Sequence, residues 1–233
     1  MKLALAPDAL SLSRQFAVLQ GCSSEELAAL EASLTCRTYA EDQMLYTAGS
    51  EPVGLYLLLR GWVKVSRWSD DGKEQIVRLA QAGHALGYRC LMANTPHANS
   101  AVALEETTLC LIERTTLRRV LASSPRLANA LGTLLAADLA TAEARMLQLT
   151  YKPVRARLAE ALLQLLRTNQ HATREPNTLV ISRDNLAALV GTTKETLCRL
   201  LTSMKDLGML TTERQGIRVL KPATLGELAA VAE

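Results

Sequence analysis

Residues 183–202, RDNLAALVGTTKETLCRLLT, have the pattern of two short helices joined by a tight turn. Apolar residues recur at helical spacing in the first helix, and Ala187 among them allows a second helix to approach closely. Gly191 is placed to end this helix, because a residue without a Cβ adopts the left-handed conformation without a clash. Thr192, followed three residues later by Glu195, predicts a capping box that starts the second helix. This spacing is typical of a helix-turn-helix.

The second helix carries leucines on one face and polar residues on the other. If the leucines turn inward, the outer face presents side chains that can enter a major groove of DNA. Arg199 can pair in bidentate fashion with guanine, Glu195 can accept from a cytosine amino group, and Lys194 can reach a base or a phosphate. The alternative is a merely solvated charged face. The residues expected to contact DNA are Thr192, Thr193, Lys194, Glu195, Cys198 and Arg199.

A β-hairpin is predicted directly after these helices. Residues 209–212 and 217–220 are short strand-like runs, and the turn between them contains Gly216. Arg214 and Arg218 would flank the hairpin and touch phosphates. Residues 151–233 hold 12 Lys/Arg against 8 Asp/Glu, so the positive surplus of the chain lies here. Residues 153–233 are therefore predicted to form a winged helix-turn-helix domain that binds double-stranded DNA.

A long helix is predicted over residues 125–152, where apolar residues follow one another at spacings of three and four. Such a narrow, heptad-like stripe favours pairing with a second copy of the same helix; an ordinary core helix is the alternative. Pro153 ends the helix, and a further helix begins at Val154. The expected dimer contacts are Leu131, Leu135, Leu139, Ala142, Met146 and Leu149.

Residues 1–124 are predicted to form an N-terminal domain dominated by strands. A short amphipathic helix over 24–34, capped by Ser23 or Ser24, precedes several runs of β-branched and aliphatic residues separated by glycines. The turn at residues 70–72, DDG, predicts a hairpin. The fold class is thus α+β: an antiparallel β-roll of the jelly-roll type, a long helix, and a winged helix-turn-helix.

Composition narrows the classes of function. The five cysteines are odd in number and far apart, which argues against a disulfide framework or a zinc site and favours buried thiols. No stretch has the length of a membrane span, and the start lacks the pattern of a secretory signal, so a cytoplasmic protein without a membrane partner is expected. No catalytic triad, metal-spaced cluster or phosphate-binding loop is present, so we expect no enzyme.

Nearly the whole chain resembles the CRP/FNR family of bacterial regulators. The resemblance rests on YTAGSEPVGLYLLLRGWVKV (46–65), DDGKEQIVRLAQAGHALG (70–87) and VGTTKETLCRLLTSMKDLGML (190–210). It implies a cyclic-nucleotide-binding-type roll, a dimerising helix, and base-reading roles for Glu195 and Arg199 at a site with a G·C-containing core. It also implies that residues 168–176 lie where the family contacts RNA polymerase.

The sensor end departs from the family's cyclic-AMP-binding branch. That branch holds the ribose with a Gly-Glu pair and the cyclic phosphate with an Arg-Ser pair. Here Tyr88 replaces the glutamate and Asn99 the arginine, and only Ser100 is retained. A buried phosphate without a cation is costly, so cyclic AMP is not expected. The effector-pocket residues that the resemblance suggests are Tyr88, Arg89, Asn99, Ser100, Ala142 and Glu143.

Other cofactors are weighed in the same way. The iron–sulfur branch needs a group of N-terminal cysteines, but only Cys22 precedes Cys36, so no cluster is expected. Haem ligation stays open because His84 and His97 lie near the expected pocket, although a lone loop histidine is more often solvated. Arg89 either neutralises an acidic effector or pairs internally, for example with Glu143.

The sequence therefore predicts a homodimeric, sequence-specific regulator of transcription, switched by an unidentified effector between the roll and the long helix. The alternative is a constitutive DNA-binding dimer whose roll has lost ligand binding.

Overall fold

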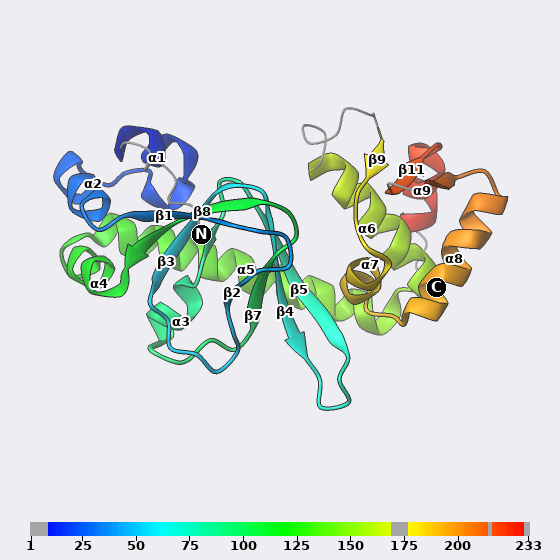
Figure 1. Cartoon of the computed structure of the whole chain (residues 1–233), viewed down its shortest axis with the longest axis horizontal. Helices are drawn as coiled ribbons and strands as arrows, with labels where there is room; N and C mark the ends of the chain where they lie inside the picture. The colour runs from blue at the N-terminus through cyan, green and yellow to red at the C-terminus, as the bar shows by residue number, and fades with distance from the viewer. Residues whose placement is uncertain (1–8, 169–176, 214–215, 231–233) are drawn as a thin grey trace. The chain divides into compact units, whose positions relative to one another are not determined.

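A computed structural model describes residues 9–168, 177–213 and 216–230 of the chain (Figure 1). It divides into two units, which we describe one at a time. The first comprises Met1–Trp68 and Val77–Thr141, and the second Ser69–Ile76 and Ala142–Glu233. The α+β fold class is confirmed. No helix in the described ranges is long and apolar enough to cross a membrane.

The N-terminal roll consists of two four-stranded sheets. The pairs β1–β8, β3–β8, β3–β6, β2–β7 and β4–β7 are all antiparallel, as in hairpin-built sheets that pack one face on a core. The first sheet has the order β1 (Thr35–Tyr39), β8 (Thr107–Glu113), β3 (Gly54–Arg60), β6 (Ala85–Leu86). The second has the order β2 (Met44–Tyr46), β7 (Ser100–Ala103), β4 (Trp62–Trp68), β5 (Glu74–Gln81).

Short helices cover one end of this roll, where α1, α2 and α4 gather in Figure 1. The predicted capping is confirmed at Ser23: its side chain accepts from the backbone N–H of Glu26, while the Glu26 carboxylate accepts from the backbone N–H of Ser23. The helices are α1 (Ala9–Gln15), the 3₁₀ turn η1 (Ala17–Leu19), α2 (Ser24–Glu31), α3 (Tyr88–Ala93) and α4 (Arg114–Ser123).

Strand β3 is buried on both faces. Leu55 and Leu57 belong to the core cluster that contains residues of the helices, whereas Tyr56 and Leu58 belong to the cluster inside the roll. Because side chains alternate along a strand, one short apolar run supplies both cores. This explains why residues 55–59, LYLLL, lack the alternation of a half-exposed strand.

The expectation of no disulfide framework did not foresee one cysteine pair. Cys36 in β1 and Cys110 in β8 are register partners, and they are joined by a disulfide with Cα atoms 3.9 Å apart. The two cysteines are 74 residues apart in the sequence, so no local pattern indicates that they lie side by side. The expectation of mostly buried thiols is wrong, since Cys22 and Cys90 are half-buried and Cys198 is exposed.

The long helix α5 runs from Pro125 to Tyr151. Leu131 is fully buried and Leu135 packs against the same core, so these two expected dimer contacts are used within the protomer instead. The first turns of α5 pack on the core of the N-terminal unit, because their apolar residues belong to the cluster that also contains residues of the short helices. Farther along, Leu139 and Met146 are each 62% exposed, and Ala142 and Leu149 are exposed too. The unpartnered apolar stripe therefore begins at Leu139.

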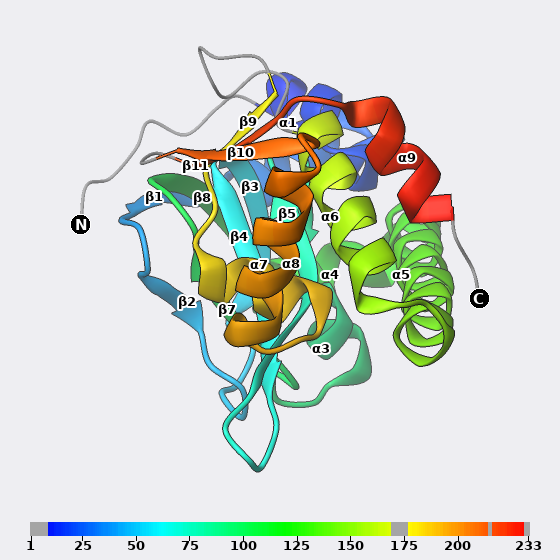
Figure 2. The same cartoon turned by 90° about the vertical axis from the view of Figure 1, so that its right-hand side faces the viewer.

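The second unit is helical with one small sheet, whose strands are drawn beside α6 and α8 in Figure 2. The sheet has the order β10–β11–β9, antiparallel throughout. Of residues 168–176, the expected polymerase-facing loop, only Thr168 lies within the described residues, at the end of α6. The elements are α6 (Val154–Thr168), β9 (Thr178–Leu179), α7 (Arg183–Val190), α8 (Lys194–Asp206), β10 (Leu210–Glu213), β11 (Gly216–Val219) and α9 (Pro222–Ala230).

Two glycine-to-alanine changes should have opposite effects on stability. At Gly54, the first residue of β3, an added Cβ would lie 2.1 Å from the carbonyl oxygen of Ile112, so Gly54→Ala should lower the free energy of unfolding by about 3 kcal/mol. Gly132 on α5 has nothing within 4 Å of that position, and Gly132→Ala should raise it by about 0.5–1 kcal/mol. Urea unfolding measures both; equal effects of the two changes would contradict the close strand approach.

Candidate nucleic-acid interface and sensor site

The first helix of the predicted motif, α7, has a defined start and end. The Ser182 side chain accepts from the backbone N–H of Asn185 at 3.1 Å, which caps the first turn. Gly191 has φ 74° and its N–H donates to the Ala187 carbonyl, as expected for a left-handed C-terminal residue. Ala187 is buried, in agreement with its predicted role at the helix contact.

Two arginines bind the carbonyl end of α7. Arg157 Nη1 donates to the Val190 carbonyl at 2.7 Å, and Arg145 Nη2 donates to the Leu189 carbonyl. The last carbonyls of a helix have no partner within it, and cations are favoured at this end of the helix dipole. Burial lowers the pKa of both guanidinium groups. The turn is therefore held by partners that lie at least 33 residues away in sequence.

The second helix, α8, starts one residue later than predicted. Its N-cap is Thr193, whose side chain accepts from the backbone N–H of Thr196 at 3.3 Å. The capping box at Thr192 and Glu195 is therefore wrong, because Thr193 is the residue with the extended backbone that an N-cap requires. Glu195 instead lies in the first turn, where hydrogen bonds to the backbone N–H and to Thr193 lower its pKa.

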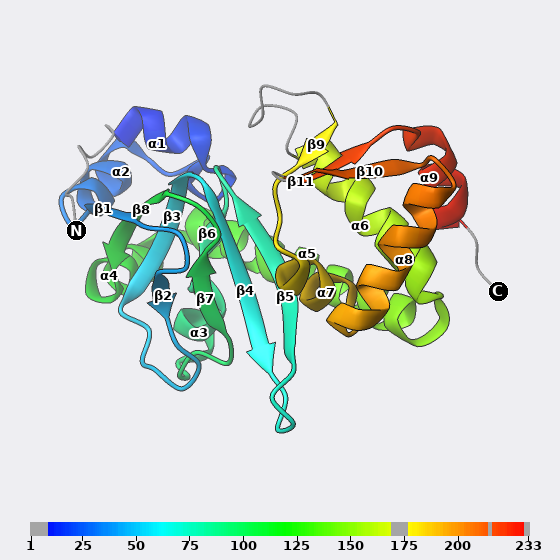
Figure 3. The same cartoon turned by 45° about the vertical axis from the view of Figure 1, so that its right-hand side comes forward.

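The helix α8, drawn as a ribbon in Figure 3, has a buried and an exposed face divided largely as predicted. Leu197 and Leu201 are buried, while Leu200 is only half-buried. The exposed side chains of the first two turns are Lys194, Glu195, Cys198 and Arg199. These four lie at spacings of one, three and four residues, so they share one side of the helix.

The two positively charged residues of the exposed face of α8, Lys194 and Arg199, make different contacts. Lys194 Nζ lies 2.9 Å from Asp184 Oδ2 at the start of α7, and this pair raises the pKa of the lysine. Arg199 Nη2 donates instead to the Thr196 hydroxyl at 3.3 Å, and its charge contributes to the lowered pKa of Glu195, one turn earlier on the same helix. The sequence analysis missed Asp184 and Thr196. Asp184 is recognisable in the sequence as an acidic residue of the first turn of α7, but no local pattern indicates that Lys194 is its partner.

The predicted wing is present as β10 and β11, with Leu210 opposite Val219. Arg218 Nε lies 3.0 Å from Glu213 Oε1, and Nη2 donates to Oε2 at 3.2 Å, so the two side chains form a paired contact across the hairpin. Arg214 lies outside the described residues.

The residues expected at the sensor pocket differ in exposure. Tyr88 is buried, whereas Arg89 is exposed. Asn99 is half-buried, and the Ser100 hydroxyl accepts from the Ala48 N–H at 3.0 Å. Ala142 and Glu143 are exposed on the part of α5 that belongs to the second unit.

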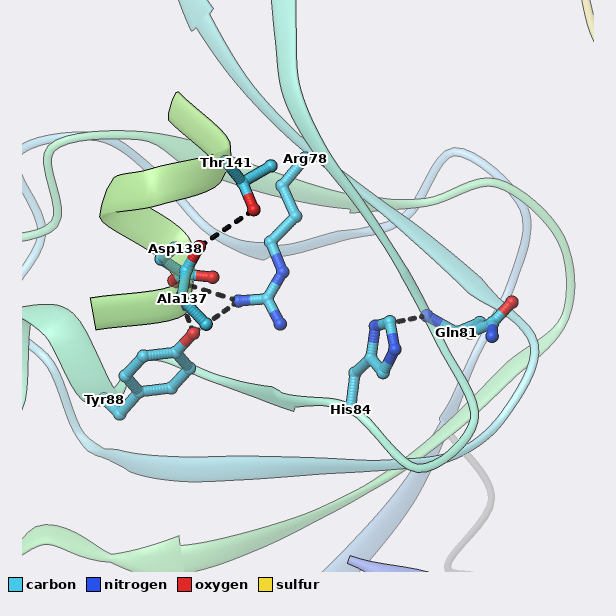
Figure 4. A network of polar contacts seen from close by, with 7 residues as sticks. All are labelled: Arg78, Gln81, His84, Tyr88, Ala137, Asp138 and Thr141. Carbon is cyan, nitrogen blue, oxygen red and sulfur yellow. Dashed lines mark hydrogen bonds and ion pairs between the residues drawn. The ribbon is translucent and has the colours of Figure 1, made fainter. Parts of the chain in front are cut away.

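Tyr88 instead joins a network that the sequence did not reveal (Figure 4). Its hydroxyl donates to Asp138 Oδ2 on α5 at 2.5 Å and accepts from Arg78 Nη1 on β5 at 2.7 Å. Arg78 Nη1 also lies 3.5 Å from Asp138 Oδ2. Burial raises the pKa of Tyr88 to about 12, so the hydroxyl keeps its proton at neutral pH and can donate it to the carboxylate.

The two histidines near the roll are less solvated than expected for loop residues. His97 is 4% exposed and its ring stacks on Tyr46 with centroids 3.9 Å apart. His84 is half-buried, and its Nδ1 accepts from the Gln81 N–H at 3.4 Å. Burial lowers the pKa of both rings, which favours neutral imidazoles.

Comparison with known proteins agrees with this architecture. Residues 36–124 match the cyclic nucleotide-binding domain, and residues 156–228 match the Crp-like helix-turn-helix domain. The solved Thermus thermophilus catabolite activator protein is 30% identical, covering 91% of this chain and 97% of that one with a TM-score of 0.51. The chain belongs to the CRP/FNR family. It is accordingly a DNA-binding transcription regulator, and its two matched domains are not those of an enzyme.

Other members of the CRP/FNR family resemble the chain over similar lengths. The cyclic AMP receptor protein of Thermus thermophilus is 29% identical over 212 residues, which are 91% of this chain and 96% of that protein. The structure of FixK2 from Bradyrhizobium japonicum is 26% identical and covers 86% of this chain and 99% of its own, with a TM-score of 0.74.

The start of the recognition helix in this CRP/FNR regulator can be tested at two adjacent threonines. Thr193→Ala removes the cap of α8 and should lower the free energy of unfolding by about 1 kcal/mol. Thr192→Ala is the matched control and should cost much less, because the N-cap hydrogen bond comes from Thr193. Denaturant unfolding of both variants gives the comparison; a larger loss for Thr192→Ala would restore the earlier start.

Proposed function

We propose that the protein binds a pseudo-palindromic DNA site as a homodimer, with one α8 in each of two successive major grooves about 34 Å apart. The observation that carries the proposal is the exposed face of α8, where Lys194, Glu195, Cys198 and Arg199 stand on one side while Leu197 and Leu201 anchor the other. A helix anchored in this way can insert its outer side chains without losing its own packing.

The chemistry of this face supports distinct roles. The hydrogen bond of Arg199 goes to the exposed Thr196 hydroxyl and not to a carboxylate, so Arg199 can exchange it for the O6 and N7 acceptors of guanine at little cost. Glu195 is ionised, because its lowered pKa keeps the carboxylate charged, and it can accept from a cytosine amino group. Lys194 must first leave Asp184 to reach a base, so we assign it to the phosphate backbone.

The wing and the N-cap supply further backbone contacts in this proposal. Arg218 is paired with Glu213, and a phosphate would compete with that carboxylate for the guanidinium. Thr193 is exposed at the start of α8, where the N-terminal end of the helix dipole favours an anion. Such contacts fix the register on DNA without reading its sequence.

Dimerisation is supported by the part of α5 that begins at Leu139. Leu139 and Met146 are seven residues apart, Leu149 follows at a spacing of three, and all three are exposed. Exposed apolar residues at heptad spacing are the pattern of a helix that pairs with another helix. A second copy of α5 is the partner that also gives the two-fold symmetry required by a palindromic site.

Regulation through the roll has two candidate forms. An effector acting between the roll and α5 would shift the population of arrangements in which both α8 helices fit the DNA. A constitutive dimer is the second candidate, and the contact of Tyr88 with Asp138 favours it, because the protein itself fills hydrogen-bonding groups there. DNA binding by the ligand-free protein separates the two.

Base reading should fail selectively when Arg199 is removed. Arg199→Ala should relax discrimination at one base pair of each half-site by about 1–3 kcal/mol, because the bidentate guanine contact is lost. Lys205→Ala removes an exposed positive charge from the last turn of the same helix and should weaken binding about equally on all duplexes.

The measurement is selection of bound sites from a random DNA pool, followed by fluorescence anisotropy on single-base variants at fixed salt. Equal losses for Arg199→Ala on specific and random duplexes would show that this side chain contacts only phosphate.

The dimer should separate when charge enters the exposed stripe of α5. Leu139→Glu combined with Met146→Glu should shift the protein from dimer to monomer in light scattering, because like charges would face each other across the helix pair. Val53→Glu, at a 56% exposed position of the roll, is the control and should leave the dimer intact. A dimer unaffected by the double change would place the interface elsewhere.

A further inference from the structure

The contacts of Arg78 have the chemistry of an anion site. The Arg78 side chain is 25% exposed, and its guanidinium carbon lies 5.7 Å from the centroid of the Tyr88 ring. Tyr88 Oη lies 2.7 Å from Nη1, and its proton is donated to Asp138. A cation and a neutral hydroxyl donor thus converge on one carboxylate, as they do in sites that bind oxyanions.

The neighbouring groups leave Arg78 as the cation of this site. His84 faces it in Figure 4, and burial together with the charge of Arg78 lowers the pKa of that imidazole. His84 is therefore neutral at neutral pH. Asp138 supplies the one negative charge paired with Arg78 among the described residues. The network is thus a single cation matched by a single anion, with Tyr88 between them.

The pairing of Arg78 with Asp138 leaves part of the guanidinium unused. Asp138 approaches through one oxygen, Oδ2, and only at 3.5 Å from Nη1. Nη2 and Nε of Arg78 make no hydrogen bond within the described part of the chain. An arginine can bind both oxygens of a carboxylate through such an edge. The site therefore has the capacity for an oxyanion in addition to, or in place of, Asp138.

We propose that Arg78 and Tyr88 form an oxyanion-binding site of the sensor unit and that its resident ligand is the carboxylate of Asp138. The proposal deepens the proposed function, since it names the chemistry through which the roll is connected to α5. The connection joins β5 and α3 to the long helix without any small molecule. A free carboxylate must compete with a carboxylate that is tethered to the site and so has a high effective concentration.

Hydrogen exchange of the amides around residue 138 tests this site without DNA. Asp138→Ala should raise their exchange rates roughly tenfold, because a hydrogen-bonded charge pair no longer resists local opening. Glu25→Gln, which removes an exposed carboxylate from the first turn of α2, is the control and should leave them unchanged. Unchanged circular dichroism confirms that both variants are folded.

Rescue of the Asp138→Ala variant by a free carboxylate tests whether Arg78 and Tyr88 bind an oxyanion. Sodium formate on the order of 100 mM should restore slow exchange in Asp138→Ala by supplying the missing carboxylate, whereas sodium chloride at equal ionic strength should not. The same formate should have no effect when Arg78→Gln is added to Asp138→Ala. Equal effects of formate and chloride, or exchange in Asp138→Ala equal to that of the unchanged protein, would overturn the proposal.

The outcome is separable from that of the proposed function. If the protein shows no preference among duplexes but exchange in Asp138→Ala responds to formate, the site stands and the proposed function fails. If the protein selects a DNA site while formate has no effect, the reverse holds.

Discussion

The burial of β3 on both faces is the constraint on which the sensor unit depends. Leu57 packs with the helices and Tyr56 inside the roll, so a shift of one residue would exchange the two sets and place a hydroxyl in the helical core. Pairing with β8 fixes this register, and the missing side chain of Gly54 permits the close approach to Ile112. Strand β8 leads directly into α4 and then α5, so the position of the long helix follows from the same register.

Much of this architecture could be predicted because it depends on local sequence patterns. The runs of β-branched and aliphatic residues predicted a domain dominated by strands, the heptad-like spacing predicted a helix over residues 125–152, where α5 ends at Tyr151, and Gly191 predicted the turn of the DNA-binding motif. Each of these depends on residues within a few positions of one another. The error at Thr192 is of the same kind: two adjacent threonines both fit a cap, and only the backbone conformation distinguishes Thr193.

The parts that could not be predicted depend on pairs far apart in the chain. Cys36 meets Cys110 because β1 and β8 are neighbours in a sheet, and Asp138 meets Tyr88 because α5 packs on the roll. The resemblance to the CRP/FNR family pointed to Tyr88 as well as to Asn99 and Ser100, but it did not indicate that Asp138 is the partner of Tyr88. The burial of Leu131 could not be predicted either. The apolar residues of α5 form one continuous stripe in the sequence, but its first part packs in the core and its later part is exposed.

Arg145 comes from α5 and Arg157 from α6, and both donate to the carbonyl end of α7. A guanidinium cannot escape burial by giving up its proton, so each must keep its carbonyl acceptor. If α5 rotated about its own axis, the anchor point of Arg145 would swing with it and pull on the turn before α8. The two arginines therefore connect α5 and α6 to the turn that precedes α8, so a rotation of α5 would also change the position of the helix whose exposed face we propose to read bases.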